Sequence, residues 1–158
     1  MSGKGLLLLT GENADTVRSA LLELNAALRA AKNENTRLVV FYSGHADSEN
    51  LHLGGTNLSL SEIRSIVKGS MARVRLLVVD ACRSGSVTRV KGVRPAPEFK
   101  LTYDAGTDAE GMAIFTSSAA GENSQESDRL RGSFFSHHFV TGLRGAADLN
   151  RDGSVSLD

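Results

Sequence analysis

Short apolar runs alternate along this chain with segments of helical periodicity. The runs cover residues 6–10, 37–43, 74–80 and 111–118, and each has the length of a buried strand. Strands that alternate with helices are typical of a mainly parallel sheet whose faces are covered by helices. The pattern therefore predicts an α/β fold with a mostly parallel central sheet flanked by helices.

Three segments between and after these runs have the features of surface helices. Residues 13–28 begin with capping candidates and continue with apolar residues at helical spacing. Ser59 and Glu62 form a capping box in front of a short apolar stripe. Ser133 is a cap for a last helix over residues 134–143.

Other stretches interrupt this alternation. Residues 51–58 alternate around the pair Gly54-Gly55, which is a hairpin signal. Residues 83–110 form a basic stretch that holds both prolines, and so long a loop inside a domain is usually functional or mobile. Residues 119–132 read as a second, polar loop.

The composition excludes several classes of protein. The chain has 158 residues, a formal net charge of zero, 5% aromatic residues and no tryptophan, so it offers nucleic acid neither a basic field nor a stacking surface. Its single cysteine excludes an internal disulfide, and no apolar run approaches the roughly 18 residues of a membrane span. We expect one soluble, cytoplasmic domain over residues 1–158, without nucleic-acid or membrane partners.

The last residues, 148–158, resemble part of a calcium loop. A glycine stands at the sixth position, and the twelfth position falls at residue 159, so we expect the chain to be a piece of a longer polypeptide. Asp, Asn and Gly also form ordinary turns, so a plain turn stays open as the alternative to calcium binding. The oxygen ligands would come from Asp148, Asn150, Asp152 and Ser154.

Two apolar runs each lead to a residue with nucleophilic or acid–base chemistry. Cys82 follows the run at 74–80, and His45 follows the run at 37–43. Parallel strands end at the same edge of a sheet, so this edge would bring a thiol and an imidazole together. Each residue alone also fits a plain position in the core or at its rim. Together they predict a cysteine hydrolase that needs no cofactor for its chemistry.

Two blocks of this sequence resemble those of a known family. Residues 41–45 (FYSGH) and 80–85 (DACRSG) are similar to the histidine and nucleophile blocks of caspase-like peptidases, in particular the prokaryotic relatives of metacaspases and paracaspases. Residues 116–120, 124–128 and 134–145 resemble further segments of the bacterial members. The resemblance implies a caspase-like three-layer sandwich and a cysteine endopeptidase.

The resemblance also implies roles for individual residues. Cys82 would attack the scissile carbonyl as a thiolate, and His45 would protonate the leaving amine and later assist water. The amides of Cys82 and Ala46 would form the oxyanion hole. The family commonly has glycine after the histidine, and Ala46 departs from this pattern while keeping the N–H group.

The residue two places before the cysteine implies a specificity. Metacaspases and paracaspases have an acid there, as this chain has Asp80, so the partner would be a protein or peptide cut after Arg or Lys. Glu126 and Asp128, and less strongly Glu122, are candidates for a second pocket acid. Solvated loop carboxylates are the alternative for these three residues.

The basic stretch at 83–110 lies where caspases are cut between their subunits. Self-cleavage there is a hypothesis, and an ordinary solvated linker is the alternative. The candidate positions are Arg89, Lys91, Arg94 and Lys100.

The main rival to an enzyme is a catalytically silent caspase-like scaffold that binds partner proteins. It would keep the fold while the cysteine or histidine was occluded. The sequence supports no role for His52, and it places His137 and His138 within a helix as structural or surface residues. The oligomeric state stays open.

Overall fold

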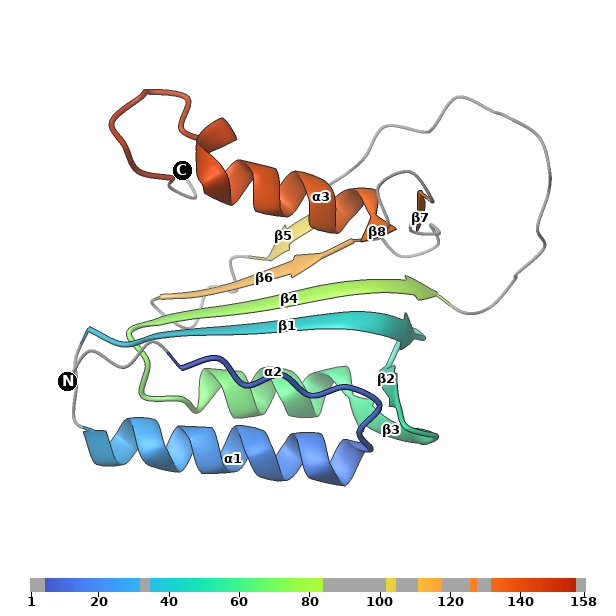
Figure 1. Ribbon diagram of the computed structural model, residues 1–158. Helices are drawn as coiled ribbons and strands as arrows, with labels where there is room; N and C mark the ends of the chain where they lie inside the picture. The colour runs from blue at the N-terminus through green and yellow to red at the C-terminus, as the bar shows by residue number, and fades with distance from the viewer. Residues whose placement is uncertain are drawn as a thin grey trace, which may run out of the picture.

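The structure is a computed structural model that describes residues 5–31, 35–83, 102–104, 111–117, 126–127 and 132–155 (Figure 1). Its helices are α1 (Ala14–Ala31), α2 (Leu60–Lys68), α3 (Phe134–Thr141) and a π turn, η1 (Gly142–Ala146). Its strands are β1 (Arg37–Ala46), β2 (Asn50–Leu53), β3 (Thr56–Ser59), β4 (Val74–Arg83), β5 (Thr102–Asp104), β6 (Met112–Thr116), β7 (Glu126–Ser127) and β8 (Gly132–Ser133).

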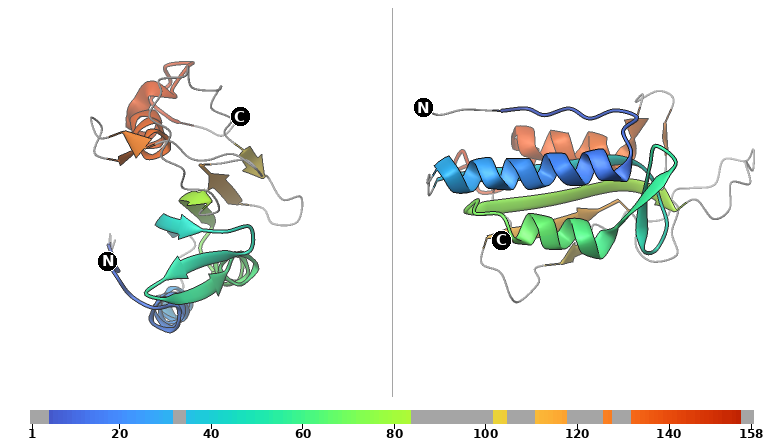
Figure 2. Two further views of the ribbon diagram at one scale, coloured as in Figure 1. Left: turned by 90° about the vertical axis from the view of Figure 1, so that its right-hand side faces the viewer. Right: turned by 90° about the horizontal axis from the view of Figure 1, so that it is seen from below.

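The main sheet has six strands in the order β3-β2-β1-β4-β6-β5. The central strands β1, β4 and β6 are parallel, and the strands at both edges are antiparallel to their neighbours. Helices α1 and α2 cover one face of the sheet and α3 covers the other, so the molecule has three layers (Figure 1; end-on in Figure 2). The predicted α/β fold class is confirmed.

Two apolar cores hold these layers together. Because side chains alternate along a strand, Leu77 and Val79 of β4 face α1 and α2, whereas Val78 faces α3. The core on the α3 side is the smaller one and is rich in aromatic rings, with Phe115 and Phe135 buried in it. The larger core is built from residues that include Leu21, Leu38, Leu51, Leu58, Ile63 and Val67.

The predicted helices form, and their caps act largely as expected. The Ser59 hydroxyl accepts a hydrogen bond from the Glu62 N–H at 3.3 Å and so caps α2. The Glu62 carboxylate does not close the capping box, because it is paired with Arg18 of α1. Glu62, which the local pattern assigned to the cap, therefore links α2 to α1.

The Gly54-Gly55 hairpin is confirmed as the turn between β2 and β3. Both glycines have positive φ, 51° and 79°, which other residues rarely adopt. A Cβ atom at Gly54 would lie 2.9 Å from the carbonyl oxygen of Glu12, just before α1. Glycine is therefore needed here both for the turn and for its contact with the start of α1.

The predicted strand over residues 6–10 is wrong. Residues 5–10 have no regular secondary structure, and Leu6 is 92% exposed. A strand needs a ladder partner, and the outer side of β1 pairs with β2 only at Ala46 and Leu51. An apolar run without a partner strand or a covered face has nothing to hold it as a strand.

The two predicted loops contain short strands that the sequence did not indicate. The strand β5 lies within the basic stretch and pairs antiparallel with β6. The two-residue strand β7 lies within the segment read as a polar loop, and it pairs with β8 at the end of that segment. Such short ladders depend on the partner strand more than on their own pattern.

In the part of the chain that the structure describes, no helix is long and apolar enough to cross a membrane.

Candidate active site

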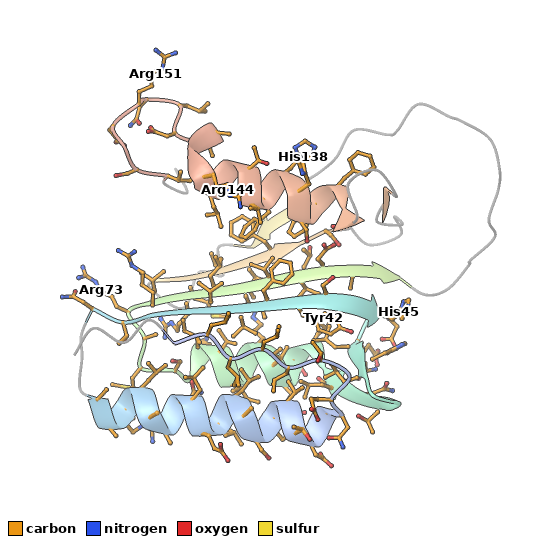
Figure 3. The ribbon with its side chains drawn as sticks, viewed as in Figure 1. Tyr42, His45, Arg73, His138, Arg144 and Arg151 are labelled. Atoms are coloured by element: carbon orange, nitrogen blue, oxygen red, sulfur yellow. The ribbon has the colours of Figure 1, made fainter. Side chains whose placement is uncertain are left out.

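The tips of β1 and β4 bring His45 and Cys82 to the same place. These two residues are register partners in the parallel ladder, and the preceding pair is Gly44 with Ala81. Register partners on neighbouring parallel strands lie on the same face, and such strands are about 4.8 Å apart. The His45 side chain is exposed at the strand tip (Figure 3). Of Cys82 the structure describes the backbone.

The turn after His45 is held by a dense set of hydrogen bonds around Asp47. One carboxylate oxygen of Asp47 accepts the N–H groups of Glu49 and Asn50, each at 2.8 Å, and the other lies 2.9 Å from Nε2 of His52. The Asp47 N–H also donates to the Asn50 carbonyl at 2.9 Å. The sequence indicated no role for His52, but its side chain braces the turn that follows the candidate catalytic histidine.

The Asp47 contacts predict a specific pH dependence. The His52 side chain, followed by the Glu49 and Asn50 N–H groups, lowers the pKa of Asp47 from 3.8 to about 2. Because the folded protein favours the charged form, the Asp47 contribution to stability is complete above the unfolded pKa and is lost as the pH falls through about 2. In urea unfolding, the stability difference between wild type and Asp47→Asn should be constant above about pH 5 and shrink below it. An NMR titration of the Asp47 carboxyl near 3.8 would contradict this.

Tyr42 reaches the same turn from the other face of β1. Its hydroxyl donates to the His45 carbonyl at 2.6 Å and lies 3.1 Å from the His52 carbonyl oxygen. A Cβ atom at Gly44 would lie 2.6 Å from this hydroxyl, so the glycine makes room for the phenol. Burial raises the pKa of Tyr42, so the phenol remains a donor at neutral pH. Figure 3 shows Tyr42 close to His45 at the end of the strand.

Ser117 holds the end of β4 immediately before the cysteine. Its hydroxyl oxygen accepts the Ala81 N–H at 3.0 Å and lies 3.3 Å from the Ala81 carbonyl oxygen, to which it donates. Ser117 is buried, at 7% exposure. Neither Tyr42 nor Ser117 was predicted from the sequence, because each stands in an apolar strand pattern. The turn at Asp47 could have been predicted from the sequence, because an aspartate side chain often accepts backbone N–H groups two or three residues later.

Asp80, the predicted pocket residue, lies on the face of β4 that α3 covers. It is 4% exposed, and its Oδ2 atom accepts hydrogen bonds from the hydroxyls of Ser133 and Ser136. Ser133 is also the N-cap of α3, where it accepts the Ser136 N–H at 3.0 Å. Asp80 therefore anchors the start of α3 to the sheet.

The other predicted pocket acids are only partly described. The backbone of Glu126 pairs with Ser133, the serine that binds Asp80, so the ladder places Glu126 next to that cluster. Asp128 and Glu122 lie outside the described residues, as do the candidate self-cleavage positions Arg89, Lys91, Arg94 and Lys100. His137 and His138 are exposed on α3, and His138 lies away from the strand tips (Figure 3).

The predicted calcium segment forms a turn with its oxygen atoms engaged by its own backbone. The Asp148 carboxylate accepts the N–H groups of Asp152 and Gly153 at 3.1 and 2.9 Å, and Asp152 accepts the Ser154 N–H at 2.8 Å. Among the described residues, no group of three or more His, Cys, Asp or Glu side chains is placed to hold a metal ion. Calcium binding by Asp148, Asn150, Asp152 and Ser154 stays a prediction.

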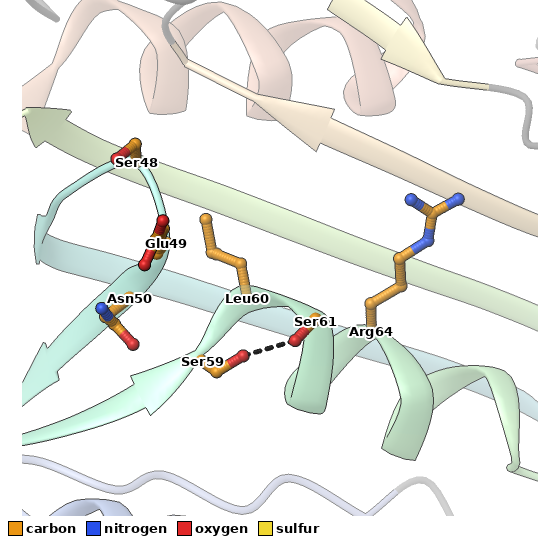
Figure 4. A pocket seen from close by; sticks show the side chains of 7 residues that line it. All are labelled: Ser48, Glu49, Asn50, Ser59, Leu60, Ser61 and Arg64. Atoms are coloured by element: carbon orange, nitrogen blue, oxygen red, sulfur yellow. Dashed lines mark hydrogen bonds between the residues drawn. The ribbon is translucent and has the colours of Figure 1, made fainter.

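A hollow of about 460 Å³, lined mainly by polar residues, lies beside the turn that follows His45 (Figure 4). None of the residues predicted for catalysis lines it. The hydroxyls of Ser59 and Ser61 are 2.6 Å apart within it, at the start of α2. Its lining residues are Ser48, Glu49, Asn50, Ser59, Leu60, Ser61 and Arg64.

The fold and the register together define a class of protein. A three-layer α/β sandwich with histidine and cysteine paired at the tips of neighbouring parallel strands is the arrangement expected of a caspase-like domain. A family model described as the caspase domain matches residues 10–154, and the chain belongs to the caspase domain family. A search of curated proteins found no match, and a search of solved structures found none.

Proposed function

We propose that this caspase-family domain is a cysteine endopeptidase in which Cys82 and His45 form the catalytic dyad. The observation that carries the proposal is the ladder register, which pairs the two residues at the open edge of the sheet. The exposure of His45 at that edge supports it further, because a peptide can reach the imidazole. Neither residue's chemistry requires a metal.

The proposed reaction is acyl transfer. The Cys82 sulfur forms a bond to the scissile carbonyl carbon, and the oxyanion is held by the N–H groups of Cys82 and Ala46. His45 gives a proton to the amine as the peptide bond breaks, then takes one from the water that releases the acid product. The braced turn at Asp47 follows directly on Ala46 and supports a fixed direction for its amide.

The proposal extends to cleavage after Arg or Lys. Asp80 lies two residues from the nucleophile, and the ladder brings the Glu126 backbone next to the serine that binds Asp80. A carboxylate there would bind a guanidinium through two parallel hydrogen bonds. A substrate arginine that uses Oδ2 would have to displace a serine hydroxyl from Asp80.

A set of fluorogenic peptides that differ only in the residue before the cut tests this function. We expect hydrolysis after Arg and Lys at least about 100-fold faster, in kcat/KM, than after Asp, because a buried carboxylate repels an acidic side chain. Alkylation of the single cysteine should abolish it.

The rival function is a silent scaffold that binds partner proteins. The burial of Asp80 and its hydrogen bonds to two serines favour the scaffold, because these contacts account for the acid without a substrate. Wild-type protein that is folded but inactive on every peptide of the set would support the scaffold and exclude the peptidase. A preference for Asp would keep the peptidase and reject the basic specificity.

A further inference from the structure

The backbone pairing between β6 and β4 ends just before Cys82, and the Ser117 side chain makes the next contacts. The ladder register ends with Val79 and Thr116, and the Ser117 N–H still donates to the Val79 carbonyl at 3.0 Å. At Ala81 the Ser117 side chain takes over, accepting the N–H at 3.0 Å and donating to the carbonyl at 3.3 Å. One buried hydroxyl therefore supports, on the β6 side, both backbone groups of the residue next to Cys82.

A second hydroxyl has the corresponding place on the histidine strand. The register between β1 and β2 consists of Ala46 with Leu51, so the two strands separate at His45. The Tyr42 hydroxyl lies at this fork, 2.6 Å from the His45 carbonyl oxygen and 3.1 Å from that of His52. It holds the backbone of His45 from the side of the sheet opposite to α3, where Tyr42 packs against the larger core.

We propose that Ser117 and Tyr42 are positioning residues that set the relative placement of Cys82 and His45. The inference rests on the proposed function, which assigns the chemistry to these two residues. The tip of β4 extends past its regular ladder with β6, whereas on β1 the ladder with β2 consists of Ala46, the residue after His45. In each case a side-chain hydroxyl holds the backbone at or next to the reacting residue. Loss of either contact lets one tip shift while the shared β1–β4 ladder still holds the fold.

The test uses Ser117→Ala and Tyr42→Phe in the whole chain. With an arginyl peptide, each variant should lower kcat by about 10- to 100-fold and change KM by less than about threefold, because misplacement affects the reacting geometry more than binding. Gly44→Ala should reproduce the Tyr42→Phe effect, since the added Cβ would lie 2.6 Å from the phenol hydroxyl and force it to move.

A second readout does not depend on turnover. Iodoacetamide alkylates a cysteine through its thiolate form, and the chain has one cysteine, so the pH profile of alkylation at Cys82 reports how closely His45 and Cys82 pair. We expect the inflection in Ser117→Ala and Tyr42→Phe to move to higher pH, toward that of His45→Ala. If wild type cleaves no peptide but these shifts occur, the positioning roles stand and the proposed function fails.

Ser70→Ala is the matched control for a buried serine. Ser70 is 4% exposed and accepts the Ala72 N–H at 3.2 Å, but it lies before the start of β4, at the end opposite to Cys82. It should lose stability comparably to Ser117→Ala while kcat and the alkylation profile remain those of wild type. Ser117→Thr, which keeps the hydroxyl, should retain most of kcat, and Tyr42→Phe with Gly44→Ala carries the test if Ser117→Ala does not fold. Unchanged kcat and alkylation profiles in Tyr42→Phe and in Ser117→Ala, or in Tyr42→Phe and Gly44→Ala if Ser117→Ala does not fold, would overturn the inference, as would an equal kcat loss in Ser70→Ala.

Discussion

Cys82→Ala is expected to lower kcat/KM for an arginyl peptide by about 1,000-fold or more. Alanine removes the atom that forms the covalent intermediate, and no other residue of the chain can replace it, because Cys82 is the only cysteine. The residual rate would come from substrate binding and the backbone amides, which the substitution leaves in place. A steady-state assay with active-site titration of the wild type measures this effect.

The same variant also tests self-cleavage. On incubation, wild-type protein should acquire a new amino terminus after Arg89, Lys91, Arg94 or Lys100, and Cys82→Ala should stay intact. Amino-terminal sequencing distinguishes the four positions. An intact wild-type chain that still cleaves peptides would reject self-processing and leave the peptidase in place.

Two histidine variants complete the comparison. His45→Ala should match the loss seen in Cys82→Ala, since the two residues act as one unit. His137→Ala removes an exposed histidine of α3 and should retain wild-type kcat/KM. Full activity in Cys82→Ala, with circular dichroism showing both proteins folded, would remove the dyad from consideration.

Asp80→Ala is expected to destabilise the protein by about 3–6 kcal/mol, because hydrogen bonds to a charged group contribute about 1.5–3 kcal/mol each and two are lost. The substitution leaves the hydroxyls of Ser133 and Ser136 without their acceptor at a site where Asp80 is 4% exposed. It also removes a negative charge from the amino end of α3, where the helix dipole favours one. Urea unfolding, analysed with a common m-value, gives the difference.

Asp80→Asn separates the structural role of this residue from its role in specificity. Asparagine keeps an oxygen that accepts from the serines, so the stability loss should be less than half that of Asp80→Ala. It removes the charge, so hydrolysis after Arg should fall by about 10-fold or more. Ser136→Ala is the complementary variant, because it weakens the anchor to α3 and keeps the carboxylate. An Asp80→Asn protein with unchanged preference for arginine would show that Asp80 only anchors α3.

Much of this fold was accessible from local pattern. Amphipathic spacing identified α1, the capping serines located the starts of α2 and α3, and the glycine pair located the β2–β3 turn. These signals involve residues within a few positions of each other, so no knowledge of distant neighbours is required. The run at residues 6–10 has equally strong strand chemistry and is nevertheless unpaired, because pattern does not specify a partner strand.

The candidate site was likewise only partly predictable from the sequence. His45 and Cys82 stand out because each follows a complete apolar run, and parallel strands bring their ends together. Glu62 shows the limit of such reasoning, since its spacing fits a capping box while its carboxylate binds Arg18, 44 residues away. Local preference is a small energy that one long-range ion pair can override.

Strand periodicity and residue chemistry were thus sufficient to identify the layers, the central parallel strands and the cysteine–histidine pair. Three-dimensional packing alone revealed that Ser117 supports Ala81 across 36 positions and that Asp80 binds two serines at the start of α3. A hydroxyl in an apolar strand has many potential partners in the unfolded chain, and nothing nearby in sequence selects among them. The choice is made only when burial excludes water and leaves one backbone or carboxylate within hydrogen-bonding distance.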